Sequence, residues 1–172
     1  HEKRETVPVV AVVSKHYKPL IFGTIGALVT FVIFYIFTVF AQKWGTQNLK
    51  YTRPDFLRMQ LIAILFFAAT VPISALIADK LDVRRVLMIV AVLCGSFGFL
   101  LQPMFVANNP SSVVIFLAIG SALMGLTYGP LGTLLSELYP PQVRFTGASL
   151  CFNLASIFGA SLTPYIADKL AL

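Results

Sequence analysis

The chain consists of long apolar runs separated by short polar segments. Five runs are rich in hydrophobic residues, and they cover residues 20–41, 57–78, 86–106, 113–135 and 148–167. About 20 helical residues cross the hydrocarbon core of a bilayer, so each run is long enough to span one. Backbone groups in lipid must be hydrogen-bonded within their own helix or a closed barrel. The pattern therefore predicts an all-α fold, a polytopic transmembrane helix bundle with the lipid bilayer as its solvent.

Composition supports this prediction and argues against a soluble domain. Hydrophobic residues make up 58% of the chain, charged residues only 12%, and the mean hydropathy is +0.84, whereas a soluble domain is about a quarter charged. The net charge of +6 is spread over short loops, with no basic helix or aromatic-interleaved stripe. We therefore expect no nucleic-acid partner, and we interpret the positive charges as determinants of membrane topology.

The distribution of Lys and Arg predicts the orientation of the spans. If the N-terminus is cytoplasmic, eight of these residues lie on the cytoplasmic side and five on the opposite side. The eight are Lys3, Arg4, Lys15, Lys18, Lys80, Arg84, Arg85 and Arg144, and the five are Lys43, Lys50, Arg53, Arg58 and Lys169. The imbalance favours a cytoplasmic N-terminus, although the loop at 42–56 would then carry its positive charges across the membrane.

No motif in the chain indicates catalysis or metal binding. Cys94 and Cys151 lie inside apolar runs without a CxxC spacing, and His1 and His16 lie outside the runs. Isolated cysteines of this kind are usually small apolar side chains. The sequence contains no His/Cys cluster, nucleophile elbow or phosphate-binding loop, so it predicts neither an enzyme nor a bound cofactor.

A few polar residues inside the runs could line a transport cavity. Polar atoms within apolar helices are costly and need a partner, and we select Tyr35, Thr38, Tyr128 and Asn153 as cavity candidates. For the threonine, the alternative is a hydroxyl bonded to its own helix. Gly129-Pro130 predicts a helix break at membrane depth, which either bends a helix that lines a pathway or is a packing kink.

The first of two informative loops closes the second run and opens the third. Residues 75–85 read ALIADKLDVRR and resemble the G-x-L-A-D-R-x-G-R-R loop signature of the major facilitator superfamily. The resemblance implies a gating role in which Asp79 pairs with Arg84 or Arg85 in one conformation and releases it in another; the alternative is a topology signal. The departures from the signature are Ala75, Asp82 and Val83.

The second loop is the more specific of the two. Residues 137–149 read ELYPPQVRFTGAS and resemble the E-L-F-P-x-x-V-R-Y-T-G-x-S segment of the metabolite/proton symporter family within that superfamily. ETVPVV at 5–10 also resembles this family's approach to its seventh helix. The resemblance implies five spans of an expected twelve, helices seven to eleven, with Glu137 and Arg144 as a gating pair.

This family resemblance implies the domain organisation and the function. Residues 1–19 would end a cytoplasmic linker, and 20–172 would form a partial C-terminal bundle whose missing N-terminal half is its partner. The implied activity is secondary active transport of a small organic acid or zwitterionic osmolyte across a bacterial-type inner membrane, by alternating access. A proton would be the coupling ion, with its carrier residue in the missing half. The alternatives are a sugar-type facilitator of the same superfamily and a non-transport membrane assembly subunit.

Overall fold

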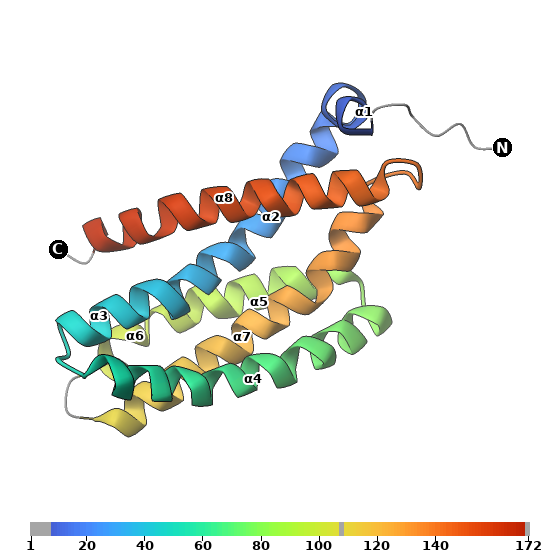
Figure 1. The fold of residues 1–172 in the computed structure, drawn as a ribbon. Coiled ribbons are helices and arrows are strands. Elements are labelled where there is room, and N and C mark those ends of the chain that lie inside the picture. The colour runs from blue at the N-terminus through green and yellow to red at the C-terminus, as the bar shows by residue number, and fades with distance from the viewer. Residues whose placement is uncertain (1–7, 107–108, 171–172) are drawn as a thin grey trace.

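The fold is an arrangement of long helices that run side by side (Figure 1). A computed structural model describes residues 8–106 and 109–170, and within these ranges every regular element is a helix. The elements are α1 (Pro8–Lys15), α2 (Tyr17–Tyr35), the π-helical turn η1 (Ile36–Phe40), α3 (Ala41–Gln47), α4 (Arg53–Lys80), α5 (Val83–Gly98), α6 (Leu101–Met104), α7 (Pro110–Glu137) and α8 (Arg144–Leu170).

Four helical segments are long and apolar enough to cross a membrane. They cover Tyr17–Gln47, Arg53–Lys80, Pro110–Glu137 and Arg144–Ala167. The first of them is continuous through α2, η1 and α3. These segments contain four of the five predicted apolar runs, and they confirm an all-α transmembrane bundle.

The third predicted run, 86–106, differs from the prediction because its helix is divided. Helix α5 ends at Gly98. The amides of Phe99 and Leu100 then donate 3₁₀-type hydrogen bonds to the carbonyls three residues earlier, those of Ser96 (3.3 Å) and Phe97 (3.0 Å). Pro103 has no N–H to donate to the Phe99 carbonyl and its ring crowds that group. A short separate helix, α6, therefore follows, and the described residues contain four long spans instead of five.

Helix α7 lies at the centre of the bundle. Half of its most apolar window (50%) is buried, compared with 17% for α4, its neighbour. Gly125 and Gly129 allow α4 to approach closely, because a Cβ at either glycine would collide with Thr70 or Ser74 respectively. The hydroxyl oxygens of Thr70 and Ser74 lie 3.0 Å from the Ala122 carbonyl and 3.1 Å from the Gly125 carbonyl, and each is also 2.8 Å from a carbonyl of α4 itself. Small residues and hydroxyl bonds of this kind hold helices together in lipid.

Helix α7 continues through Gly129 and Pro130 to Glu137, so the pair does not divide the helix, and a bend at this point stays a prediction. Pro130 is fully buried, and its missing N–H is accommodated inside the packed bundle, as neighbouring helices allow in membranes. Gly129 serves the α4 contact and does not unwind the helix. The Gly-Pro pair therefore has a packing role in the bundle.

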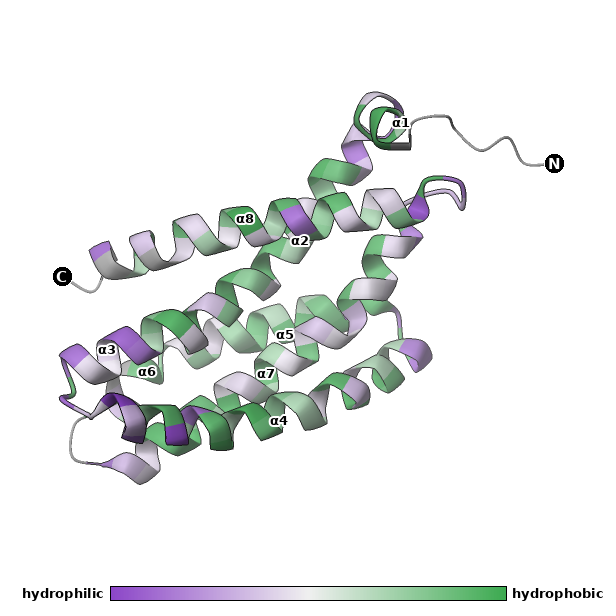
Figure 2. Ribbon diagram, in the orientation of Figure 1, coloured by the Kyte–Doolittle hydropathy of each residue, from purple (hydrophilic) through white to green (hydrophobic). Residues whose placement is uncertain are grey.

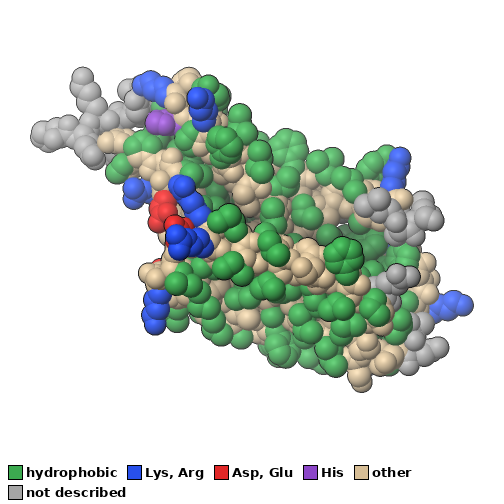
Figure 3. Space-filling model, turned by 180° about the vertical axis from the view of Figure 1, so that it is seen from behind, with side chains coloured by type: hydrophobic (Ala, Val, Ile, Leu, Met, Phe, Trp, Pro, Cys, Tyr) green, Lys and Arg blue, Asp and Glu red, His purple; other side chains and the backbone are tan. Residues whose placement is uncertain are grey.

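Charged and apolar side chains are segregated along the bundle. Figure 2 shows the hydrophilic segments mainly towards the helix ends and hydrophobic segments between them. In the view of Figure 3, apolar side chains cover the middle, and acidic and basic side chains gather at the end that holds α1. Large exposed hydrophobics occur on α2, α4, α5 and α8, for example Phe22, Leu61, Val92 and Ile157. Such a surface suits lipid or further helices.

Candidate substrate cavity

A cavity with polar side chains lies between the first span, α4 and α7. Its volume is about 240 Å³, and its walls are mostly apolar, including Phe37, Leu61 and Met124. Four uncharged polar residues also line it: Thr38, Gln42, Gln60 and Ser121. An apolar pocket with a few convergent polar groups is the usual form of a small-molecule site.

A π-helical turn positions the first wall of this cavity. Within η1 the amide of Ala41 bonds to the Ile36 carbonyl, five residues back. Such turns are rare and often lie at functional sites. Gln60 of α4 supports the turn, because its Nε2 donates to the carbonyls of Phe37 (3.1 Å) and Thr38 (2.9 Å). Two spans are thereby held together beside the cavity.

The two hydroxyls in the cavity differ in how much of their hydrogen-bonding capacity is already used by the protein. Thr38 Oγ1 donates to the Phe34 carbonyl at 2.6 Å, so its hydrogen is committed and its lone pairs remain. Ser121 is buried on α7, and within the described residues its hydroxyl has no hydrogen-bond partner. Because Ser121 lines the cavity, its hydroxyl is available to a bound molecule.

The other predicted cavity residues lie outside this pocket. Tyr35 is half-buried against the core formed by α1, α2, α7 and α8, with its ring edge-on to Phe34 at 5.4 Å. The Tyr128 ring lies between Phe67 (5.7 Å) and Phe152 (6.3 Å). Asn153 is exposed on α8; its Nδ2 donates to Ser149 O at 2.8 Å, within the same helix. Of the four candidates, Thr38 is the one placed in the cavity.

Sequence reasoning missed Gln60 and Ser121. Gln60 is the fourth residue of the apolar run 57–78. An amide is costly in lipid without a partner, and this cost was the signal that could have identified it. Ser121 sits in a span rich in small residues, where serine commonly packs between helices. Nothing in the sequence distinguishes it from those packing residues.

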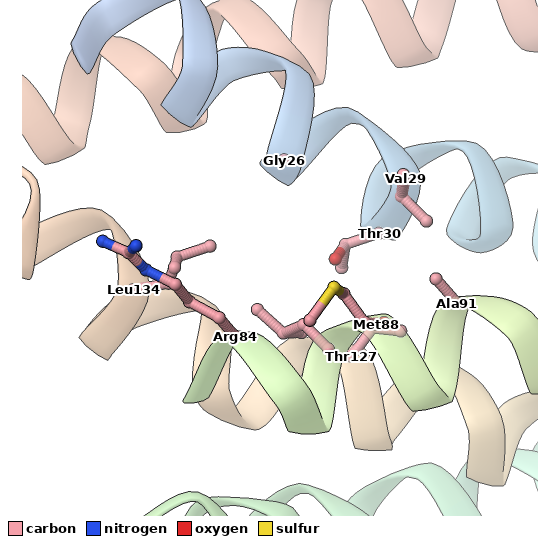
Figure 4. Close-up of a pocket in the computed structure, with 9 residues that line it drawn as sticks. Gly26, Val29, Thr30, Arg84, Met88, Ala91, Thr127 and Leu134 are labelled. Atoms are coloured by element: carbon pink, nitrogen blue, oxygen red, sulfur yellow. The ribbon is translucent and has the colours of Figure 1, made fainter. Parts of the chain in front are cut away.

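A second cavity, of about 250 Å³, lies between α2, α5 and α7 (Figure 4). Its lining includes Thr30, Met88, Thr127 and Arg84. The Thr127 hydroxyl is committed to the Met124 carbonyl at 2.8 Å, and the Arg84 guanidinium extends away from Thr30 toward Leu134. Its polar side chains are fewer than those of the first cavity, three against four, and the rest of its lining is apolar.

The predicted gating residues share one end of the bundle without forming ion pairs. In the described parts of the chain, no ion pair joins Asp79 to Arg84 or Arg85, or Glu137 to Arg144. The Arg144 Nε donates instead to the Tyr139 carbonyl at 3.4 Å. All five side chains are exposed, and in water a charge gains little from such a pair. Their gating role stays a prediction.

The chain between α7 and α8 is anchored by Tyr139. This residue is buried, and its hydroxyl lies 3.1 Å from the thiol of Cys151. Burial, then the bond and charge interaction with Cys151, raise the pKa of the Tyr139 hydroxyl well above its usual value. Gly147 permits this arrangement, because a Cβ there would lie 2.6 Å from the tyrosine ring. The aromatic residue in the loop motif therefore has a packing role.

In the Asp79 loop, structure and gating can be separated by two matched substitutions. The Asp82 carboxylate accepts the Arg84 amide hydrogen at 2.8 Å and caps α5. Asp82→Ala is expected to destabilise the protein by about 1 kcal/mol in equilibrium unfolding. Asp79→Ala should leave stability unchanged, since Asp79 makes no such bond within the described residues. Equal losses in both variants would contradict this assignment.

Proteins of similar sequence are named as metabolite transport proteins and as a citrate-proton symporter. The chain is 39% identical to the inner membrane metabolite transport protein YhjE of Escherichia coli (strain K12), over 96% of the chain and 39% of that protein. It is 39% identical to a putative metabolite transport protein of Haemophilus influenzae (98% and 41%) and 27% identical to the citrate-proton symporter of Salmonella typhi (96% and 38%). No family model and no solved structure matches.

The fold is that of a polytopic helical membrane protein with a polar-lined cavity between its spans. Its relatives cover nearly all of the chain and are named metabolite transport proteins and a citrate-proton symporter. By sequence the chain thus belongs with the metabolite/proton symporters of the major facilitator superfamily, as its two loops predict. It spans about two fifths of the length of these relatives. It is an integral inner-membrane protein.

Proposed function

We propose that this chain forms part of a proton-coupled transporter of small organic acids that works by alternating access. The observation that carries the proposal is the cavity lined by Thr38, Gln42, Gln60 and Ser121. It places uncharged hydrogen-bonding groups from three spans around one small space, which transport of a polar metabolite through lipid requires. The relatives named as metabolite transport proteins support the same activity.

Coupling to protons and the orientation of the chain are further parts of the proposal. A relative named as a citrate-proton symporter supports proton coupling. None of the residues that line the cavity in the described structure is a carboxylate or a histidine, so the proton would be carried elsewhere in the transporter. The excess of Lys and Arg at 1–19, 80–85 and 144 supports a cytoplasmic location for the α1 end.

The proposal is tested by uptake into proteoliposomes that contain the full-length transporter. Labelled citrate, succinate, betaine and a hexose are offered with and without an inwardly directed proton gradient. We expect uptake of an organic acid, several-fold faster with the gradient, and loss of that stimulation when an ionophore collapses it. Acid uptake at the same rate with and without the proton gradient would contradict symport. Hexose uptake alone would favour a sugar facilitator, and uptake of no probe would favour an assembly role.

A further inference from the structure

The hydrogen-bond pattern of the cavity carries information about the ligand. Both hydrogens of the Gln60 amide nitrogen are used by the carbonyls of Phe37 and Thr38. Because both partners are acceptors, the nitrogen must face them, and the orientation of the amide follows. The amide oxygen of Gln60 then remains, and within the described residues no protein group donates to it. It is a fixed acceptor in the cavity wall.

Thr38 presents a second fixed acceptor in the lining of the same cavity. Its hydroxyl hydrogen is directed to the Phe34 carbonyl at 2.6 Å, so only the oxygen lone pairs can meet a ligand. Thr38 also supplies one of the two carbonyls that hold the Gln60 amide. The π-helical turn, the Gln60 amide and the Thr38 hydroxyl therefore form one unit whose free groups accept hydrogen bonds.

The remaining polar groups are adaptable, and the lining holds no charge. Gln42 and Ser121 can each donate or accept. None of the lining residues in the described chain is Lys, Arg, Asp or Glu. A carboxylate, which only accepts, would face the oxygens of Gln60 and Thr38 without a cation to compensate it, and that arrangement is costly in a low-dielectric site.

We propose that this cavity binds a hydroxyl group of the substrate, which makes the transporter selective for hydroxylated organic acids, with the carboxylates held outside the cavity. The hydroxyl donates its one hydrogen to the oxygen of Gln60 or Thr38, and Ser121 or Gln42 donates to the hydroxyl oxygen. The inference rests on the proposed function and adds a substrate class to it. A substrate without the hydroxyl leaves this acceptor and this donor unpaired, and sites built to bond a hydroxyl reject such analogues strongly.

The test compares acids that differ by a single hydroxyl. Malate against succinate and citrate against tricarballylate are measured as substrates and as competitors in proteoliposomes with the full-length transporter. We expect the hydroxylated member of a pair to be preferred by about 10-fold or more in the ratio of maximal rate to KM. Equal handling of both members would overturn the inference and leave the proposed function intact. Failure to transport any of the four would refute the proposed function itself.

Variants assign the preference to the two acceptors. Gln60→Met keeps the shape of the side chain but removes the amide, and it should lower the preference for the hydroxylated acid toward 1. Thr38→Val removes one acceptor and keeps the Gln60 bonds, so the preference should fall even if Gln60→Met does not fold. Gln47→Met, at an exposed position of α3, is the control and should retain it. A preference unchanged in both cavity variants would overturn the assignment.

Discussion

Ser121→Leu is expected to reduce uptake by about 100-fold or more while the protein stays folded. The leucine side chain would occupy part of a cavity of about 240 Å³, so a bound molecule is displaced from the productive position, and small misplacements already cost about that factor. The site is not tightly packed, because the serine faces the cavity, so the leucine fills empty space. The measurement is initial uptake by purified, reconstituted variant, with the fold checked by its thermal unfolding.

A matched substitution in the other cavity is the control. Ala91 lines the cavity between α2, α5 and α7, and Ala91→Leu adds bulk there in the same way. Because we place the substrate in the other cavity, uptake should stay within about 2-fold of the unmodified transporter, while Ser121→Leu is nearly inactive. The reverse pattern would move the substrate site to the α2–α5–α7 cavity.

Gly129→Leu is expected to destabilise the bundle by about 2–4 kcal/mol, the largest stability effect that we predict. A Cβ at this position would lie 2.5 Å from the Val71 carbonyl and would also collide with the Ser74 side chain. A backbone carbonyl cannot move aside without displacing α4, so overpacking costs about 1–3 kcal/mol. Separation of the helices also weakens the Ser74 to Gly125 bond of 3.1 Å, worth about 0.6 kcal/mol in a membrane.

Gly132→Leu, about one helical turn after Gly129, is the control variant. Gly132→Leu introduces the same side chain into the same helix, but a Cβ at Gly132 meets nothing within 4 Å. That variant should be as stable as the unmodified protein, or slightly more stable, because leucine favours helix by about 1 kcal/mol over glycine. Equilibrium unfolding in mixed detergent and SDS micelles measures both variants. Equal losses would show that α4 and α7 do not pack closely at Gly129.

The spans and their order were predictable because lipid imposes a simple rule on sequence. Apolar runs of about 20 residues must be helices there, and four of the five runs each lie within one continuous helical segment. The exception, 86–106, contains Pro103 near its end, and a proline there is compatible with either a kink or a new helix. The tertiary context decides between them, and this context is absent from the residue pattern.

The cavity was less predictable than the spans. Thr38 was selected because a hydroxyl in an apolar helix needs a reason, and it does line the cavity. Asn153 was selected on the same ground, but its amide is satisfied by the Ser149 carbonyl one turn earlier. Periodicity cannot separate these cases. It also assumes 100° per residue, and η1 departs from that spacing just where the cavity lies.

Gly129 and the proline that follows it in α7 illustrate a related ambiguity. Gly129 followed by Pro130 was interpreted as a break, because both residues weaken an isolated helix. In the bundle, Gly129 lies against α4 and Pro130 is buried, so packing maintains the helix that local propensity disfavours. The spacing Gly125-x-x-x-Gly129 is the signal that favours close helix packing.

The central claim, that substrate occupies the cavity between the first span, α4 and α7, is tested most directly by protection of introduced cysteines. Ser121→Cys and, separately, Met88→Cys in the α2–α5–α7 cavity are made in the full-length transporter with Cys94→Ala, and their reaction rates with a small maleimide are measured. Saturating transported substrate should slow modification at position 121 by about 10-fold or more and leave position 88 unchanged. If substrate does not change the modification rate at position 121 but slows the rate at position 88, the account is contradicted.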